Sequence, residues 1–145
     1  MIYPDDIVAE AREWIGTPWQ HQQRLKGVAT DCIGLVGCVA LELGIDGAKE
    51  WADDPDLHHY GPTPDPHLLL AGCDRFLDRI EIDDALPGDV LIMAFRRDPQ
   101  HFAIVSRLDP IYLIHAYASV GRVVENGVKI ARARILRAYK YRGVV

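Results

Sequence analysis

The sequence predicts an α+β fold, with N-terminal helices packed on a C-terminal antiparallel β-sheet. The main helical signal is an apolar run at residues 33–43, which Thr30-Asp31 precedes and Gly44 follows. The main strand signal is a series of short runs rich in Val, Ile and aromatic residues after the turn sequence Leu86-Pro87-Gly88-Asp89. Helices come first and strands follow without βαβ alternation, which favours an antiparallel sheet.

Length and composition are those of one globular domain covering residues 1–145. The apolar fraction is 49%, the charged fraction 26% and the formal net charge −5. This acidic balance gives no bulk electrostatic attraction for nucleic acids. Basic residues collect near the C-terminus, and we interpret them as the solvated face of a strand, because no aromatic stacking platform accompanies them. These residues are Arg132, Arg134, Arg137, Lys140 and Arg142.

The three cysteines, Cys32, Cys38 and Cys73, form no Cys-x-x-Cys pair. This spacing indicates neither a disulfide framework nor a zinc ribbon, and reduced thiols in a cytosolic setting are the simpler interpretation. The N-terminus has no basic segment followed by an apolar one, so we expect cytoplasmic synthesis without a signal peptide. The apolar run at 33–43 is too short to span a membrane.

Cys32 is expected in the first turn of a buried helix at residues 31–43. Thr30 or Asp31 can cap its start, and Gly44 can adopt the left-handed conformation that ends a helix. The positive end of the helix dipole then lies at the Cys32 sulfur and favours a thiolate. Cys38, deeper in the same helix, gains no such stabilisation and is expected to be an inert packing residue.

Two further helices are expected, one before this helix in the sequence and one after it. The first is capped by Asp5 or Asp6 and ends at Gly16, with apolar positions at Ile7, Val8, Ala11, Trp14 and Ile15. The other begins at Pro66, and its apolar face is made of Leu69, Leu70, Cys73, Phe76, Leu77 and Ile80. The acidic, proline-rich stretch at 46–65 is expected to be irregular and on the surface.

Strands are expected at 90–95, 101–106 and 111–117, with a charged turn at 96–100. Two more strands, at 121–125 and 128–139, are expected to form a hairpin across Asn126-Gly127, because this dipeptide is a strong hairpin-turn signal.

Two histidines on neighbouring strands offer a base for Cys32. If residues 106–110 form the turn of a hairpin, His101 faces His115, with Cβ atoms about 5 Å apart. A cysteine nucleophile needs such a base and a third group that orients it. In this arrangement His101 is the base and His115 holds its other ring nitrogen.

The same register indicates which face of the sheet is buried. It places Ala103 opposite Leu113 and Val105 opposite Ile111, on the face that carries the two histidines. Because these four residues are apolar, we expect this face to be the core face on which the Cys32 helix packs.

Each candidate residue also has an ordinary structural interpretation. A cysteine at a helix start can be a packing residue, and a histidine in a strand can be partly exposed or a hydrogen-bonded core group. The cluster of His58-His59, Asp65 and His67 matches no zinc spacing, so we expect a solvated loop there and no metal site. Cys73 is expected in the core.

Several separate motifs, in order, resemble the NlpC/P60 cysteine peptidase family. They are Gly16-Thr17-Pro18-Trp19, Asp31-Cys32-Ile33-Gly34-Leu35-Val36, Pro87-Gly88-Asp89-Val90, His101-Phe102-Ala103-Ile104-Val105 and a downstream His115. The motifs and their surroundings span most of the chain. Gln20-His21-Gln22 and Lys26-Gly27, before the Asp-Cys pair, look most like the phage-tail and gene-transfer-agent branch.

The resemblance implies a papain-like fold and a thiol protease that hydrolyses peptidoglycan stem peptides in the cell wall. It implies Cys32 as nucleophile, His101 as base and His115 as the orienting residue. It also suggests that Asp31 lies near the substrate's amine and that the Cys32 backbone N–H is an oxyanion donor. No cofactor is expected, and phage-tail proteins are possible partners of a form associated with virions.

Two positions depart from the family pattern. The family often has Ser after the cysteine, where this chain has Ile33, and Tyr after the Thr-Pro, where it has Trp19. Trp19 lacks the hydroxyl, so it either shapes the substrate pocket or packs in the core. Two other functions therefore stay open. One is a tail-assembly or structural protein with the peptidase fold and no required activity, and the other is a thiol amidase or acyltransferase on another substrate.

Overall fold

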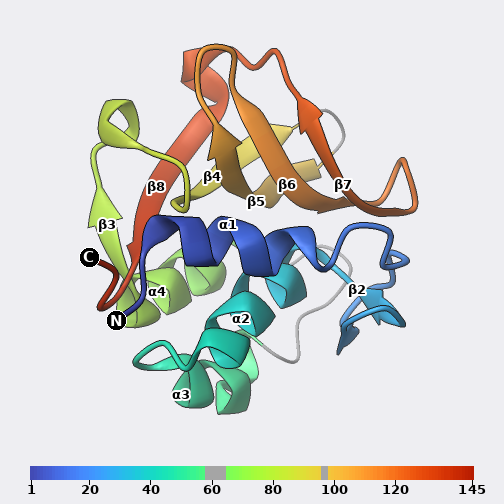
Figure 1. Cartoon of the computed structure of the whole chain (residues 1–145), viewed down its shortest axis with the longest axis vertical. Coiled ribbons are helices and arrows are strands. Elements are labelled where there is room, and N and C mark those ends of the chain that lie inside the picture. Colours follow the sequence, from blue (N-terminus) through green and yellow to red (C-terminus); the bar gives the residue numbers. More distant parts are fainter. Residues whose placement is uncertain (58–64, 96–97) are drawn as a thin grey trace.

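A layer of helices lies against a six-stranded antiparallel sheet in the computed structural model, which describes residues 1–57, 65–95 and 98–145 (Figure 1). The helices are α1 (Pro4–Arg12), α2 (Cys32–Leu43), α3 (Ala48–Asp53) and α4 (Pro66–Phe76). The strands of the large sheet are β3 (Leu77–Ile80), β4 (Val90–Phe95), β5 (Asp98–Arg107), β6 (Tyr112–Tyr117), β7 (Arg122–Gly127) and β8 (Ile135–Tyr141). A small ribbon pairs β1 (Arg24–Leu25) with β2 (Ala29–Thr30). The predicted α+β class is confirmed.

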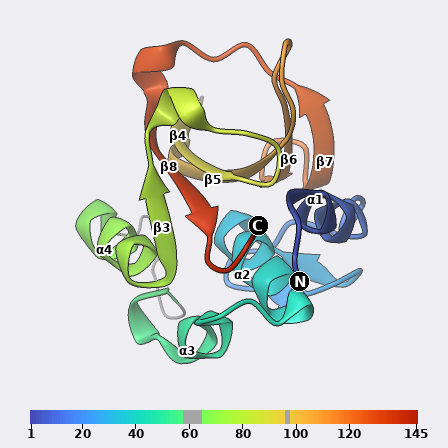
Figure 2. The same ribbon diagram turned by 60° about the vertical axis from the view of Figure 1, so that its left-hand side comes forward.

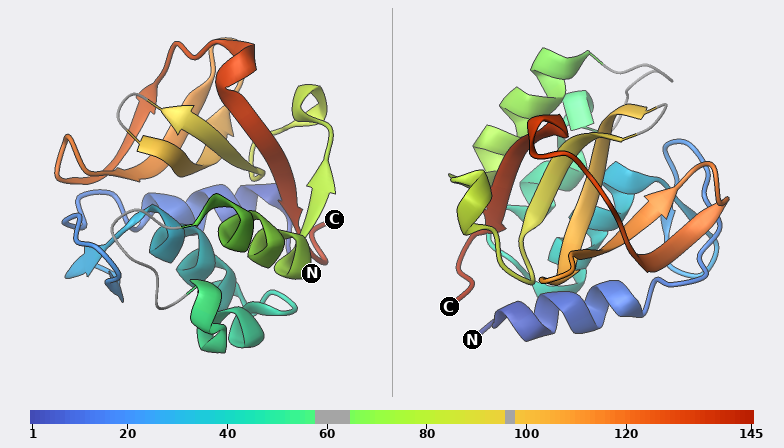
Figure 3. Two further views of the ribbon diagram at one scale, coloured as in Figure 1. Left: turned by 180° about the vertical axis from the view of Figure 1, so that it is seen from behind. Right: turned by 90° about the horizontal axis from the view of Figure 1, so that it is seen from above.

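The large sheet has the order β3-β8-β4-β5-β6-β7, and every neighbouring pair is antiparallel. The sheet is strongly curved, and the helices lie on the outside of the curve (Figure 2). The two chain ends lie close together, since Val145 N–H donates to the Ile2 carbonyl at 3.0 Å (Figure 3). Of the helices in the described ranges, none is long and apolar enough to cross a membrane.

The curvature buries both faces of the sheet in separate apolar clusters. The outer face packs against Ile33, Leu35 and Val36 of α2, and its residues are Val90, Ile92, Phe102, Ile104, Ile114 and Ala116. The inner face forms a second cluster of Leu91, Met93, Phe95, Ala103, Val105 and Leu113. Apolar residues from the connections at 80–85 and 128–135 close this second cluster.

The predicted core face is therefore wrong. Ala103, Val105 and Leu113 lie inside the curve, whereas α2 packs on the alternate residues of the same strands. The strands are apolar on both faces, and period-two alternation cannot then tell which face meets the helices.

The predicted register between β5 and β6 is also wrong, by two residues. Val105 lies opposite Leu113, and Ile104 lies opposite Ile114. β5 runs on to Arg107 with an irregularity after Val105, so the connection begins later than the 106–110 turn that we expected. Because side chains alternate, an even displacement leaves His101 and His115 on the same face.

The predicted hairpin across Asn126-Gly127 is absent. Both residues lie inside β7, where Asn126 pairs with Leu113 and Gly127 with Tyr112. β8 starts only after a short 3-10 turn at Arg132–Arg134, and it pairs with β3 and β4. The local turn preference is overridden because β6 offers a complete partner for the backbone of β7.

The helix around Cys32 agrees with the prediction. Asp31 is the N-cap, since its Oδ1 accepts from the Gly34 N–H at 2.7 Å, and Gly44 ends α2 with φ of 68°. The β4 bounds, Val90–Phe95, are also confirmed.

The other helices differ from the prediction in their ends. α1 starts at Pro4, with Tyr3 as N-cap, and ends at Arg12, so Ile15 is exposed beyond it. α4 ends at Phe76, because residues 77–80 leave the helix to pair with β8 as β3.

The 46–65 stretch is more ordered than expected where the structure describes it. It contains α3, and Trp51 and Leu57 are buried. Trp51 packs so closely on α2 that a Cβ at Gly37 would lie 1.9 Å from its ring. Asp65 caps α4 by accepting from the His67 N–H at 2.8 Å. His58-His59 lie outside the described residues.

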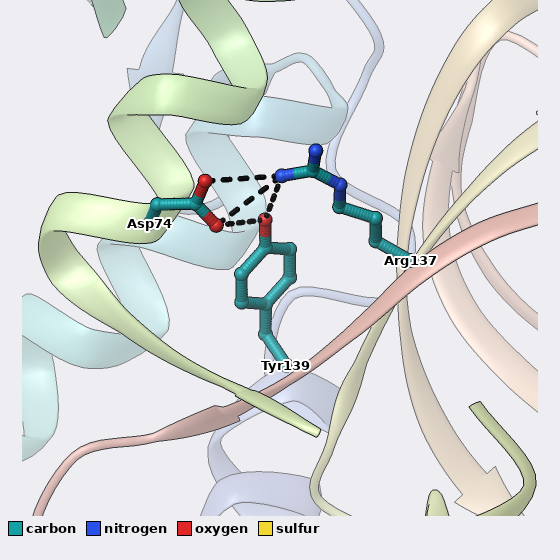
Figure 4. Close-up of polar contacts among 3 residues, drawn as sticks. All are labelled: Asp74, Arg137 and Tyr139. Carbon is teal, nitrogen blue, oxygen red and sulfur yellow. Dashed lines mark hydrogen bonds and ion pairs between the residues drawn. The ribbon is translucent and has the colours of Figure 1, made fainter. Parts of the chain in front are cut away.

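A polar clamp, formed by Asp74, Arg137 and Tyr139, ties α4 to the sheet (Figure 4). The Tyr139 hydroxyl donates to Asp74 Oδ1 at 2.7 Å, and Arg137 Nη1 donates to Asp74 Oδ2 at 3.0 Å. Arg137 Nη1 also donates to the Tyr139 hydroxyl at 3.2 Å. The clamp therefore joins a helix residue to two residues of β8.

Candidate active site

The two histidines of the predicted site are in direct contact. His101 on β5 and His115 on β6 are both buried, and His101 Nε2 lies 2.7 Å from His115 Nδ1. They are diagonal neighbours across the strand pair, because the register is displaced from the expected one. The contact arises because side chains at such positions share one face of the sheet and lie within reach of each other.

Aromatic rings hold both imidazoles in place. Phe95 stacks on His101 with ring centroids 5.4 Å apart, and Tyr117 stacks on His115 at the same 5.4 Å. The two imidazoles meet edge to face, with an interplanar angle of 74°. These ring contacts leave little rotational freedom to either imidazole, which keeps His101 Nε2 aligned with His115 Nδ1.

A third side chain, Asn126 on β7, extends the contact. His115 Nε2 lies 2.8 Å from Asn126 Oδ1. Val124 is paired with His115, and Asn126 follows two residues later on the same face of the strand. Sequence reasoning missed Asn126 because Asn-Gly indicated a turn. Continuing the alternation of β7 through Asn126 would have found it.

Cys32 is the first residue of α2 and is half-buried. Its neighbour Asp31 is buried and binds two backbone groups: Oδ1 accepts from the Gly34 N–H, and Oδ2 accepts from the Gln22 N–H at 2.8 Å. The helix start is thereby fixed to the preceding loop. Gly34 is required at this close approach, since a Cβ there would lie 2.7 Å from Thr30 Oγ1.

The segment at 16–20 links the helix start to the histidine strands. Thr30 N–H donates to the Pro18 carbonyl at 2.9 Å, and Trp19 N–H donates to the Gly121 carbonyl at 2.8 Å. Gly121 directly precedes β7, which pairs with β6. α2 also packs on β5 and β6, the strands that carry the histidines. His101 and His115 themselves lie with Phe95 and Tyr117 on the inner face of these strands, and not on the face that packs on α2 as we expected.

Trp19 is half-buried, and its side chain packs against the same apolar cluster as Cys32. Its place beside the helix start is compatible with either predicted role, as a pocket wall or as a core residue.

The other two cysteines are buried in the core, as expected. Burial raises the pKa of Cys38 to about 11 and that of Cys73 to about 12. Both side chains are thiols at neutral pH, and neither is an accessible nucleophile.

Within the described ranges, no group of three or more His, Cys, Asp or Glu side chains is arranged to hold a metal ion. His67, from the cluster considered above, lies at the exposed start of α4.

Comparison of whole structures finds NlpC/P60 domains. The chain superposes on the NlpC/P60 domain of the peptidoglycan hydrolase SagA with a TM-score of 0.63, at 22% identity over 96% of this chain and 99% of that one. It superposes on an N-acetylmuramoyl-L-alanine amidase from Bacteroides uniformis with a TM-score of 0.65, at 12% identity over 96% of this chain and 98% of that one.

A third similar structure, NlpC2 from Trichomonas vaginalis, gives a TM-score of 0.66 at 13% identity. The match covers 96% of this chain but 46% of NlpC2, so the chain spans about half the length of that protein. No protein-family model and no curated protein sequence matches the chain. The structure therefore places the chain, by its fold, with the papain-like α+β domains of the NlpC/P60 type.

Proposed function

We propose that this chain is a cysteine peptidase that hydrolyses peptidoglycan stem peptides, with its catalytic residues in a single domain at 1–145. Cys32 is the nucleophile, His101 the base and His115 the residue that orients the base. The observation that carries the proposal is the 2.7 Å contact between the two buried imidazoles, on strands that α2 contacts. Likeness in fold to a peptidoglycan hydrolase domain supports the substrate class.

The proposed reaction uses His101 Nδ1, because Nε2 of the same ring faces His115. Nδ1 takes the proton from Cys32 Sγ, and the thiolate attacks the carbonyl carbon of the peptide bond. The resulting imidazolium returns the proton to the leaving amine, so that a thioester remains on Cys32. Water, deprotonated by His101, then hydrolyses the thioester and releases the carboxylate product.

In the proposed reaction, the start of α2 stabilises the negative charges of the thiolate and the oxyanion. The backbone N–H of Cys32 is at the first helical position, where the helix provides no carbonyl acceptor. It is therefore suited to donate to the oxyanion of the tetrahedral intermediate, and the helix dipole favours both this charge and the thiolate.

Asp31 and Trp19 are proposed to bind substrate next to the nucleophile. The Asp31 carboxylate already accepts two backbone N–H groups, and a substrate ammonium group would make a further contact with the same charge. The Trp19 ring would form an apolar wall beside it.

Substitution of each cysteine tests the proposal. Cys32→Ala is expected to abolish release of muropeptides from purified peptidoglycan and labelling by iodoacetamide at pH 7.5. Cys38→Ala and Cys73→Ala are matched controls that should retain both, because the two thiols are buried with raised pKa values. Equal labelling of all three thiols in the folded protein would contradict the proposal.

An amidase activity is the second candidate, favoured by the likeness in fold to the N-acetylmuramoyl-L-alanine amidase. The same thiol chemistry at the bond between the muramic acid lactyl group and L-alanine would release an intact stem peptide. A stem-peptide endopeptidase releases shorter peptides. Mass spectrometry of the products from one defined muropeptide distinguishes the two.

Association with a phage tail or gene-transfer agent is proposed from the resemblance at Gln20-His21-Gln22 and Lys26-Gly27 alone. A particle-associated protein would be detected in purified particles by an antibody. If Cys32→Ala particles assemble and infect normally, the structural role with no required activity is the better description.

A further inference from the structure

We infer that Asn126 is a positioning residue that fixes the proton positions on both imidazoles and leaves His101 Nδ1 as the basic nitrogen. The inference deepens the proposed function and takes its catalytic meaning from it. It rests on two contacts in series: His101 Nε2 to His115 Nδ1 at 2.7 Å, and His115 Nε2 to Asn126 Oδ1 at 2.8 Å.

Asn126 determines which ring nitrogen of His115 carries the proton. An amide oxygen can only accept a hydrogen bond, so the nitrogen that faces it must carry a proton. His115 Nε2 therefore donates to Asn126 Oδ1. In a neutral imidazole one nitrogen carries the proton and the other accepts, and His115 Nδ1 is then an acceptor.

Because His115 Nδ1 must accept a hydrogen bond, the proton position on His101 is also determined. Two ring nitrogens at 2.7 Å need one proton between them, because two N–H groups would repel and two lone pairs would gain no bond. Since His115 Nδ1 accepts, His101 Nε2 donates. A neutral His101 then has its lone pair on Nδ1, the nitrogen that the proposed reaction uses as base.

The arrangement also suits the charged state of the reaction. When His101 gains a proton on Nδ1, its Nε2–H continues to donate to His115 Nδ1 with no rearrangement of protons. His115 stays neutral throughout, because a second proton on its Nδ1 would face the Nε2–H of His101. A neutral amide at position 126 fits this role, since it accepts from His115 without supplying a charge that would favour the imidazolium form of that ring.

Strand pairing holds Asn126 in a fixed position next to His115. Strand β7 is paired with β6 along its whole length, from Tyr112↔Gly127 to Tyr117↔Arg122, so the backbone at Asn126 is held in register with His115. The Tyr117 ring stacks on His115 and restricts rotation of the imidazole. The acceptor and the ring are therefore both fixed before any substrate binds.

Nitrogen-15 NMR of the histidine rings tests the inference directly at pH 8, because protonated and unprotonated ring nitrogens have well-separated chemical shifts. The wild-type protein is expected to show both His101 and His115 protonated on Nε2 and unprotonated on Nδ1. A proton on His115 Nδ1 would overturn the inference, since the Asn126 amide would then have to present its NH₂ group to the ring.

Two variants of similar size separate positioning from space filling. Asn126→Leu removes the acceptor, and it is expected to mix the tautomers of both rings and to lower kcat on peptidoglycan and the iodoacetamide labelling rate of Cys32 by about 10- to 100-fold, with KM unchanged. Asn126→Asp keeps an acceptor oxygen and is expected to retain the wild-type tautomers at pH 8. A Leu variant with wild-type ring signals and labelling rate would overturn the inference.

The two proposals fail in different ways. If the wild-type tautomers are as expected but no peptidoglycan product forms, the proposed substrate is wrong and the assignment of Asn126 stands. If peptidoglycan is hydrolysed but His115 carries its proton on Nδ1, the function stands and the role of Asn126 is overturned. Should Asn126→Leu fail to fold, the wild-type spectrum alone decides.

Discussion

Two groups of three polar side chains join different elements of this molecule, and they differ in chemistry. The clamp of Asp74, Arg137 and Tyr139 contains an ion pair between α4 and β8. The group of His101, His115 and Asn126 joins β5, β6 and β7 through contacts between ring nitrogens and an amide oxygen, and both imidazoles are buried. We call the second group the histidine relay.

The difference shows why only one of the two groups is suited to chemistry. In the clamp, burial raises the pKa of Tyr139 to about 12, and Arg137 is always protonated, so neither group changes charge near neutral pH. Each imidazole of the relay can donate at one ring nitrogen while accepting at the other. This property suits the relay to the proton transfer that we propose, whereas the clamp joins two elements of the fold.

Of the changes to these two groups, removing the proposed base should have the largest effect. His101→Ala is expected to lower kcat on peptidoglycan by about 10³-fold or more, since members of a catalytic triad act as a unit. Circular dichroism should show the wild-type secondary structure. Activity within tenfold of wild type would show that the relay is no more catalytic than the clamp.

Breaking the clamp should affect stability and leave kcat unchanged. Asp74→Ala removes the acceptor of both the Tyr139 hydroxyl and the Arg137 guanidinium, and it is expected to lower the free energy of unfolding by about 1–2 kcal/mol. The partly exposed position of Asp74 keeps the effect modest. Urea denaturation measures the loss, and an accompanying fall in kcat above threefold would contradict the separation of the two groups.

A smaller change within the clamp isolates one hydrogen bond. Tyr139→Phe keeps the buried ring and removes only the hydroxyl, so the expected loss is about 1 kcal/mol in the free energy of unfolding. If its loss equals or exceeds that of Asp74→Ala, the hydroxyl and not the ion pair holds α4.

The smallest expected effect concerns Arg12 and Glu125, the ion pair beside the relay. The hydrogen bond from Arg12 lowers the pKa of Glu125, which directly precedes Asn126. A lowered folded-state pKa stabilises the protein above the unfolded value of about 4.3, and this contribution disappears as the pH falls through the folded value.

Arg12→Gln should therefore lower the free energy of unfolding by about 0.5 kcal/mol at pH 7, because the arginine is largely exposed. The difference from wild type should shrink as the pH falls below the unfolded-state value of about 4.3, and it should vanish once the carboxyl group is protonated in both states. Chemical denaturation at a series of pH values from 7 downward measures it. A pH-independent difference would mean that Arg12 acts through packing and not through charge.

The predictions that held depend on local chemistry. Asp31, one of the two candidate N-caps, Gly44 as helix end and the bounds of β4 follow from capping and apolar patterning within a few residues. The expected contact between His101 and His115 also held, although the two residues are diagonal and not directly opposite, because face parity survives an even displacement. Whether Cys32 and His101 act together stays a prediction that the variants above test.

The predictions that failed depend on partners far away in the sequence. Residues 77–80 continue a helical pattern but pair with β8, and Asn126-Gly127 continues a strand because β6 lies beside it. Choosing between the two apolar faces of the sheet depended on its curvature, which no single strand encodes.

The sequence by itself therefore determined the α+β class, the helix that begins at Cys32 and the shared face of His101 and His115, since short-range capping and side-chain alternation control them. Only the tertiary structure decided that Asn126 completes the relay and that α2 packs on the outside of the curved sheet. Such choices compare the free energies of competing long-range pairings, and these depend on which strands the rest of the fold brings together.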